Sequence, residues 1–227
     1  MPRFLHLADI HLGFDRYGHP TRTRDFFAAL YDVLQRYAIE PQVDFVVIAG
    51  DLFEHKNVAP PILNQAKVCL KLLQDAKIPV LAIEGNHDNR PYGTRTNWLR
   101  YLADWDWLIL LEPDTLVADD ADDADDRSPA ATEVGLCLQP WDPKTKRGGY
   151  IDLDCGVRVL GSSWYGSTAP QAIEQLATAI TQLPPGPHST VMLFHHGMEG
   201  QIARYAGALR YSDVLPLRQA GVDYLAL

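Results

Sequence analysis

The chain has 227 residues, of which 47% are hydrophobic and 22% charged, an ordinary composition for a soluble globular protein with one large core. Its longest apolar runs are only strand-sized, which excludes a membrane span. The amino-terminal apolar stretch is interrupted at His6 and ends at Asp9, unlike a secretion signal. Three widely spaced cysteines without a C-x-x-C pattern indicate reduced thiols, as expected in the cytoplasm.

The formal net charge of −9 argues by itself against a polyanionic partner. Six of the negative charges come from one Ala/Asp-rich tract at residues 119–126, and the rest of the chain carries only −3. Several of the remaining carboxylates lie in candidate metal motifs, where bound cations would offset them. The net charge therefore neither excludes nor indicates nucleic acid.

The first predicted unit is a strand, a polar loop and a helix. Residues 3–8 alternate enough to form a strand, and Asp9 and His11 follow it two positions apart. Side chains at this spacing on a loop can face one ion, although a D-x-H triplet alone is weak evidence. Residues 25–37 have the apolar spacing of a helix that faces the core.

The second unit repeats this order. The β-branched run at residues 45–49 predicts a buried strand, and Asp51 follows it. Residues 62–75 then have the apolar spacing of a second helix. The β-loop-α order at two consecutive crossovers predicts parallel strands with right-handed connections.

A third strand, residues 79–83, leads into the most informative motif of the chain. We expect Gly85 to let the backbone turn sharply as it leaves the strand. Asn86, His87 and Asp88 follow, and they offer an amide oxygen, an imidazole and a carboxylate. These groups between them serve metal ligation and proton transfer.

The remaining segments complete one α/β domain over residues 1–227. We expect helices at 97–105 and 171–183, and strands at 108–111, 132–138, 150–153, 156–160, 190–194 and 224–227. Residues 112–131 contain the Asp/Ala tract, which cannot bury enough apolar surface to become ordered, so they predict a flexible acidic loop within the domain. His195 and His196 follow the strand at 190–194.

Four predicted strands thus end in His, Asp or Asn side chains. Because the carboxyl ends of strands meet at one edge of a sheet, these side chains are expected to converge. Hard oxygen and imidazole ligands suit Mn, Fe or Zn ions. Asp51 is the natural bridge between two ions, since its carboxylate has two oxygens and its strand lies between the others in chain order.

In this order, the motifs resemble the signature of the calcineurin-like metallophosphoesterases. They are D-x-H at residues 9–11, G-D at 50–51, G-N-H-D at 85–88 and the later His195. Segments 4–13, 48–53 and 82–88 are more closely similar to the SbcD-type DNA repair nucleases. The resemblance covers essentially the whole chain. It implies a four-layer α/β/β/α sandwich of two mixed sheets flanked by helices, and a two-metal phosphodiesterase that acts as a DNA exonuclease.

The resemblance also implies a role for each site residue. Asp9 and His11 would bind the first ion, Asp51 would bridge, and Asn86 and His195 would bind the second. Manganese is the expected metal, with iron or zinc as alternatives. His87 would protonate the leaving oxygen, with Asp88 as the further catalytic residue. Asp88, Glu54 or His55 would orient the imidazole of His87, and the sequence does not choose among the three.

The family pattern ends with Gly-His-x-His after a final strand, one His for each ion. Here the predicted strand at 224–227 is the last segment, so we expect a fragment with weakened metal binding and little or no activity. For the full protein, the resemblance implies DNA and an SbcC-type ATPase as partners, no membrane contact, and a possible homodimer.

Arginines after the first and third motifs favour a DNA substrate, since they could hold backbone phosphates. They are Arg16, Arg22, Arg24, Arg90, Arg95 and Arg100. Ordinary surface charge explains them equally well. Two other functions stay open: a metallophosphoesterase for nucleotides or other non-DNA phosphoesters, and a non-catalytic scaffold with a degenerate metal site.

Overall fold

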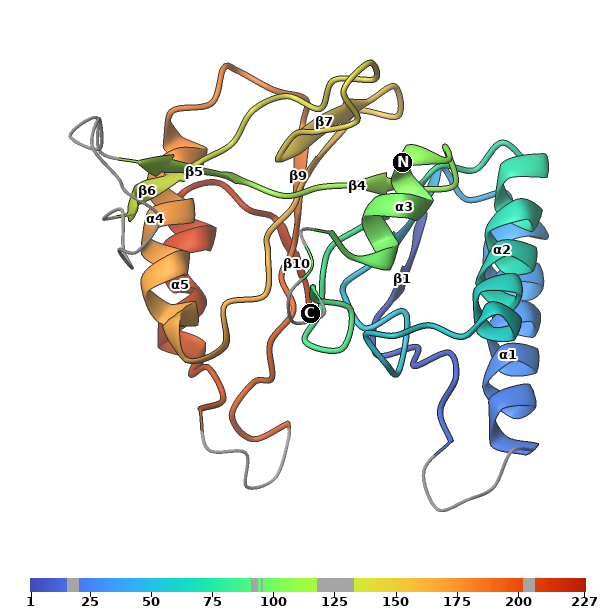
Figure 1. The fold of residues 1–227 in the computed structure, drawn as a ribbon. Coiled ribbons are helices and arrows are strands. Elements are labelled where there is room, and N and C mark those ends of the chain that lie inside the picture. Colours follow the sequence, from blue (N-terminus) through green and yellow to red (C-terminus); the bar gives the residue numbers. More distant parts are fainter. Residues whose placement is uncertain (16–20, 91–93, 95, 118–132, 202–206) are drawn as a thin grey trace.

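The structure is a computed structural model that describes residues 1–15, 21–90, 94, 96–117, 133–201 and 207–227. Two β-sheets lie side by side in the middle of the molecule, and helices cover the outer side of each (Figure 1). The first sheet and its helices come from the amino-terminal half of the chain, and the second sheet and its helices from the carboxy-terminal half.

The first sheet is parallel and is built from β-loop-α units. Its strands, in spatial order, are β1 (Phe4–Leu7), β2 (Phe45–Ile48), β3 (Val80–Ala82) and β4 (Ile109–Leu110). The connecting helices are α1 (Thr21–Leu34), continued by a π-helical turn (Gln35–Ile39), α2 (Pro60–Asp75) and α3 (Trp98–Asp104). Parallel neighbours need such crossovers, which is why β1, β2 and β3 are each followed by a helix.

The second sheet is mixed. Its order is β10 (Tyr224–Ala226), β9 (Ser189–Leu193), β8 (Val157–Leu160) and β7 (Tyr150–Leu153), and only the β7–β8 pair is antiparallel. The helices on its outer face are α4 (Ala169–Thr181), which follows a 3₁₀ turn η3 (Gly166–Thr168), and α5 (Tyr211–Gln219). A separate ribbon pairs β5 (Asp114–Val117) with β6 (Glu133–Cys137).

Alternation along the strands creates three apolar layers. In β2, Val46 and Ile48 pack toward the helices, whereas Phe45 and Val47 pack toward the second sheet. The second sheet does the same: Val159 faces the first sheet, and its neighbour Leu160 packs against α4. Strands buried on both faces read as continuous apolar runs, which explains the sequence of residues 45–49.

The structure confirms the expected α/β/β/α sandwich, with two differences in detail. We expected two mixed sheets, but the four strands of the first sheet are all parallel, because a helical crossover connects each strand to the next. Residues 114–117, which we placed in a flexible loop, form β5, because their backbone pairs with the antiparallel strand β6. Residues 118–131 of that loop lie outside the described residues, and their flexibility stays a prediction.

Candidate metal centre

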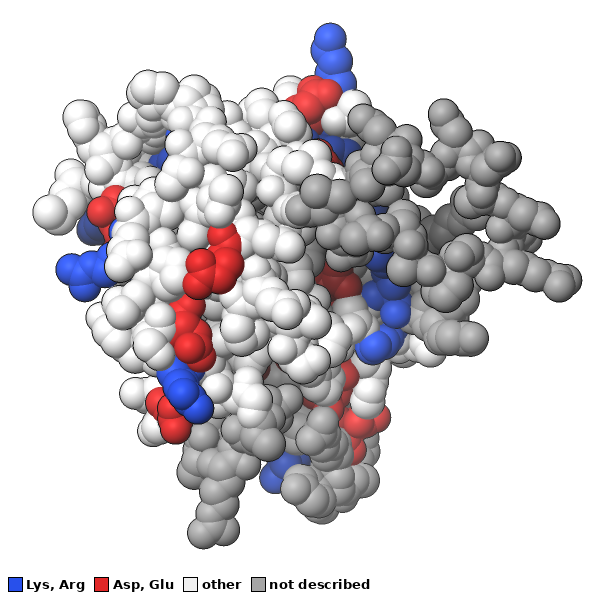
Figure 2. Space-filling view, turned by 90° about the vertical axis from the view of Figure 1, so that its left-hand side faces the viewer, with Lys and Arg blue, Asp and Glu red and all other residues white. Residues whose placement is uncertain are grey.

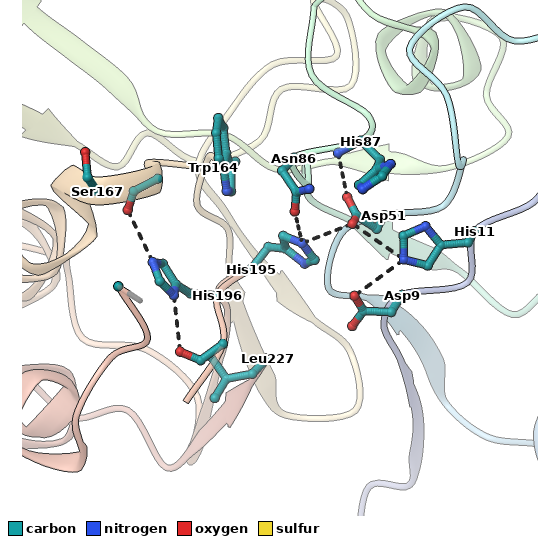
Figure 3. Close-up of a pocket in the computed structure, with 13 residues that line it drawn as sticks. Asp9, His11, Asp51, Asn86, His87, Trp164, Ser167, His195, His196 and Leu227 are labelled. Carbon is teal, nitrogen blue, oxygen red and sulfur yellow. Dashed lines mark hydrogen bonds and ion pairs between the residues drawn. The ribbon is translucent and has the colours of Figure 1, made fainter. Parts of the chain in front are cut away.

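The candidate metal ligands lie where four strands end at the gap between the two sheets (Figure 3). Asp9 and His11 follow β1, Asp51 follows β2, Asn86 follows β3, and His195 follows β9 in the opposite sheet. Main-chain hydrogen bonds fix the first two loops together, since His11 N donates to Asp51 O at 3.0 Å and Asp9 N to Gly50 O at 3.3 Å. The site is therefore built on the two sheets.

Two groups of potential ligand atoms meet at Asp51. The first consists of His11, Asp51 and His87, the second of Asp9, Asp51 and His195, and within each group the ligand atoms lie within 4.8 Å of one another. Asn86 belongs beside the second group, because its Oδ1 lies 2.9 Å from His195 Nε2. The five residues that we expected to hold two ions thus come together, with Asp51 common to both groups.

Asp51 has one oxygen committed to the protein and one directed at the ligands. Its side chain is only 2% exposed. Oδ1 accepts the main-chain N–H of His87 at 2.8 Å, whereas Oδ2 lies 3.7 Å from His11 Nε2 and 3.4 Å from His195 Nε2. A buried carboxylate between two imidazoles is well placed to share a pair of cations.

Both histidine ligands are held by their other ring nitrogen. His195 Nδ1 donates to the carbonyl of Ala49 at 2.8 Å, and His11 Nδ1 lies 2.8 Å from Glu54 Oε2. This leaves each Nε2 facing the site, the arrangement common to metal-binding histidines. The neutral Nε2 of His195 presents a lone pair to the oxygens of Asn86 and Asp51, so these acceptors repel one another unless a cation lies between them. The donor set therefore fits a divalent metal ion.

The local field also favours positive charge. The hydrogen bond that Asp9 accepts from the His11 ring, helped by the charges of Asp51 and Glu54, raises the pKa of His11 above its ordinary value although desolvation opposes it. Burial lowers the pKa of His195, but its contacts with Asp51 outweigh burial and the net shift is upward. The site attracts protons in the same place where it would attract metal ions.

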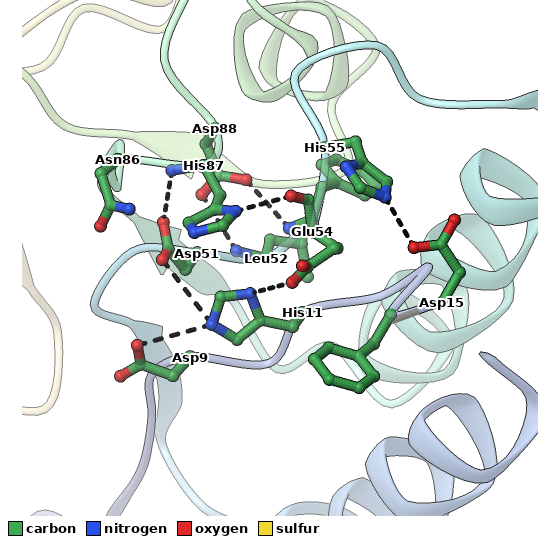
Figure 4. Close-up of polar contacts among 12 residues, drawn as sticks. Asp9, His11, Asp15, Asp51, Leu52, Glu54, His55, Asn86, His87 and Asp88 are labelled. Carbon is green, nitrogen blue, oxygen red and sulfur yellow. Dashed lines mark hydrogen bonds and ion pairs between the residues drawn. The ribbon is translucent and has the colours of Figure 1, made fainter. Parts of the chain in front are cut away.

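Glu54 supports two members of the site at once (Figure 4). It is buried, its carboxylate contacts His11, and its main-chain carbonyl accepts a bond from His87 Nδ1 at 2.6 Å. Sequence reasoning named Glu54 only as one of three candidates to orient His87, and it missed the contact with His11. The signal was the burial of a carboxylate three residues after Asp51, which only the fold reveals.

We expect Glu54→Gln to weaken Mn²⁺ binding about 10- to 100-fold, because loss of a partner that orients a metal-binding histidine has effects of this size. Calorimetric titration with Mn²⁺ measures it. Glu40→Gln changes an equally charged residue at the end of the π-helical turn, outside both ligand groups, and should leave the affinity unchanged. Equal affinities in wild type and Glu54→Gln would show that His11 does not depend on this carboxylate.

The imidazole of His87 is oriented by the chain rather than by a carboxylate. Its ring stands edge-on to that of His11, with centroids 4.9 Å apart. Because Nδ1 is bonded to the Glu54 carbonyl, Nε2 is the nitrogen available to a substrate. The other two candidates lie elsewhere: Asp88 accepts the N–H groups of Leu52 and Phe53 at 2.9 Å each, and His55 pairs with Asp15 at 3.0 Å.

Asp88 is fully buried within this network. Desolvation raises the pKa of Asp88 to about 7, although the two main-chain N–H bonds lower it. These bonds attach the loop after β3 to the loop after β2. In the structure, Asp88 thus fixes the position of the two loops relative to each other.

The motif backbone is strained where it presents its ligands. Asp9 and His11 both have φ of 51°, and Asp51 has φ of 54°, a left-handed region that costs a non-glycine residue about 1–3 kcal/mol. Gly50 also has a positive φ, of 93°, which glycine adopts without this cost, and both motif glycines provide space. A Cβ on Gly50 would lie 2.5 Å from the His195 ring, and a Cβ on Gly85 would lie 2.1 Å from Asp51 Oδ1. We expected Gly85 to supply a turn; it does not adopt positive φ, and its function is close approach.

The metal centre opens into a cleft of about 480 Å³. Trp164, Ser167 and His196 line the side away from Asp9 and His11 (Figure 3). His196 lies 3.2 Å from the carbonyl oxygens of Gly166 and Gly197, outside both ligand groups. Leu227 also lines the cleft. The weakened metal binding expected without a Gly-His-x-His segment stays a prediction.

Of the six arginines that we expected near the site, Arg22 and Arg24 are exposed on α1 and Arg100 serves the fold. Arg100 is buried and bonded to Glu112 and to the carbonyl of Lys146, so it holds α3 to neighbouring loops and cannot reach DNA. Arg90 is exposed, while Arg16 and Arg95 lie outside the described residues. The face over α4 and α5 is largely uncharged, with acidic and basic side chains scattered over it and no basic patch among the residues that are drawn in colour (Figure 2).

Comparison with known protein families gives a match to the calcineurin-like phosphoesterases over residues 2–225. The chain belongs to this family. It is also similar to proteins called DNA double-strand break repair protein Mre11. The Archaeoglobus fulgidus protein is 44% identical over 86 residues, 38% of this chain and 19% of that protein. The Halobacterium salinarum protein is 35% identical over 147 residues, 65% of this chain and 34% of that protein.

The matched segments span at most about a third of these relatives' length. Membership of the phosphoesterase family agrees with the α/β sandwich and with the ligand groups around Asp51. As for membrane segments, no helix in the described parts of the chain is both long and apolar enough to cross a bilayer.

Proposed function

We propose that the chain is the nuclease domain of an SbcD-like DNA repair exonuclease, a two-metal phosphodiesterase. The observation that carries this proposal is the convergence of Asp9, His11, Asn86 and His195 on Asp51. In the structure the ligand groups join Asp9 to His195 and His11 to His87, and the division between the two ions that follows is the one that the family resemblance implies. Asp9 and His11 would hold one ion, Asn86 and His195 the other, and Asp51 both. When bound, divalent cations supply Lewis acidity to a phosphodiester and activate water for in-line attack.

His87 is the proposed general acid. Its Nδ1–H is bonded to the Glu54 carbonyl, so a second proton on Nε2 makes the ring an imidazolium whose free N–H faces the cleft. Transfer of that proton to the leaving oxygen returns the neutral ring with Nδ1–H still bonded, so the ring need not rotate. Asp88 would contribute to catalysis indirectly, because its hydrogen bonds hold the loop that carries His87.

The names of the relatives support DNA as the substrate class. We further propose that manganese is the physiological metal, that the protein acts in the cytoplasm, and that an SbcC-type ATPase and a second copy of the chain are its partners. These proposals follow from the family resemblance. The described arginines add little, because Arg100 serves the fold.

The test is a single-turnover assay with protein in excess over end-labelled linear duplex DNA, with Mn²⁺ or with EDTA. We expect Mn²⁺-dependent release of nucleotides at a low rate, in keeping with the weakened metal binding expected for this chain. Hydrolysis of a small chromogenic phosphodiester without hydrolysis of DNA would favour a phosphoesterase for other substrates. Failure with both substrates while Mn²⁺ binds would favour the non-catalytic scaffold.

We expect His87→Ala to lower the rate of hydrolysis by about 10²- to 10⁴-fold, the usual contribution of general acid catalysis. Mn²⁺ binding measured by calorimetry should change little, because in this proposal His87 is not a ligand. Since one ring nitrogen of His87 lies within 4.8 Å of ligand atoms of His11 and Asp51, the two measurements decide its role. Loss of one bound ion in His87→Ala would identify His87 as a ligand instead.

Metal binding should weaken as the pH falls through neutrality. The pKa values of His11 and His195 are raised, so protons compete with the ions at a higher pH than an ordinary histidine would allow. Below these pKa values the protonated rings are no longer ligands. Calorimetric titrations between pH 6 and pH 8, a window around the ordinary histidine pKa of about 6.5, should show affinity rising with pH. A flat profile would contradict the assignment of the two histidines.

A further inference from the structure

The cleft beside the metal centre has two unlike walls. One carries the polar ligands described above, and the other includes the indole of Trp164 together with Ser167 and His196. Figure 3 shows Trp164 on the loop that enters η3, across the cleft from Asp9 and His11. A flat aromatic ring thus borders the same space as the proposed phosphate site.

Trp164 is exposed but firmly supported. The residue is 39% exposed. A Cβ on Gly166 would lie 3.3 Å from the indole, so the glycine makes room for the ring. The next residue anchors the loop: Tyr165 stacks on Phe194 with centroids 5.9 Å apart, and its carbonyl accepts bonds from Thr168 N and Oγ1 at 3.1 and 2.8 Å.

Within the described chain, no other aromatic ring is recorded as stacking on Trp164. Exposure of a large apolar ring at the edge of a polar cleft costs hydrophobic free energy, which is recovered when a ligand covers it. The ligand must be flat and must carry an anionic ester toward the metal ligands. A nucleotide has both properties, since every base has a π-face on which an aromatic side chain can stack.

We propose that Trp164 is a stacking platform for the base of the nucleotide whose phosphate occupies the metal centre. This inference rests on the proposed function. Trp164 would then select esters that carry a base over simple phosphate esters, without preference for one base, because stacking tolerates every base.

The test compares two ligands by their affinity for the whole chain in saturating Mn²⁺: deoxyadenosine 5′-monophosphate and base-free deoxyribose 5-phosphate. Stacking on one aromatic ring predicts that Trp164→Ala loses about 10-fold or more of its affinity for the nucleotide. Its affinity for the sugar phosphate and for Mn²⁺ should equal that of wild type. Trp164→Phe keeps an aromatic face and should recover most of the loss.

Trp105→Ala is the matched control, since Trp105 is 51% exposed on the surface but lies outside the cleft. It should bind both ligands like wild type. Equal loss of both ligands in Trp164→Ala, or no loss of either, would overturn the role of Trp164 and leave the proposed function standing. If wild type in Mn²⁺ binds neither ligand, the proposed function fails, and this inference fails with it.

Discussion

Asp51→Asn should abolish binding of both metal ions. The amide keeps the size of the side chain and an oxygen that can accept the N–H of His87, which now bonds Oδ1 at 2.8 Å. It removes the negative charge between His11 and His195, whose Nε2 atoms lie 3.7 and 3.4 Å from Oδ2. A neutral amide is a poor bridge between cations, so we expect Mn²⁺ affinity to fall by more than about 100-fold at both sites.

Calorimetry with Mn²⁺ measures this loss, and a denaturant titration checks that the variant stays folded. Asp75→Asn is a matched control, because Asp75 lies on the surface and forms an exposed ion pair with Lys71 at 2.8 Å. Asp9→Ala and Asn86→Ala should each remove one ion and spare the other. One ion bound at wild-type affinity in Asp51→Asn would contradict the shared role and place Asp51 in a single site.

Gly85→Ala should displace Asp51 by a steric clash. An added Cβ would lie 2.1 Å from Asp51 Oδ1 and 2.4 Å from the main-chain nitrogen of Asp51. The main-chain atom cannot move away cheaply, because Asp51 is buried and its carbonyl accepts a bond from His11 N. Overpacking of this kind costs up to about 3 kcal/mol. We expect that loss in the free energy of unfolding, together with loss of Mn²⁺ binding.

Denaturant titrations of wild type and variant measure the first effect, and calorimetry measures the second. Gly135→Ala is the control, since the nearest atom to its added Cβ is a Leu116 methyl at 4.0 Å. It should change stability by no more than about 0.5 kcal/mol. Wild-type stability and metal binding in Gly85→Ala would show that the loop after β3 adapts more easily than its packing indicates.

The sequence predicted the strands that are buried on both faces, because such strands are continuous apolar runs. The runs at 45–49 and 79–83 are apolar on both faces, and in the structure they are buried between helices and a second sheet. The ligands could be named because they directly follow such strands. Their convergence required only that strand ends share an edge.

Other features depend on contacts that no local pattern encodes. Helix α5 has little amphipathic pattern and contains Pro216, so its nine residues gave no helical signal. The role of Arg100 depends on Glu112 and Lys146, which are distant in the sequence. Glu54 could be assigned to His11 only after the loops following β1 and β2 were seen side by side.

The most direct test of the shared site is the electron paramagnetic resonance spectrum of the chain at saturating Mn²⁺, after subtraction of the spectrum of free ion. Ions that share the Asp51 carboxylate are close enough for their electron spins to couple. We predict the multiline signal of a spin-coupled manganese pair in wild type, and its disappearance in Asp51→Asn. Only the six-line signal of isolated Mn²⁺ in fully loaded wild type would contradict a two-metal centre built around Asp51.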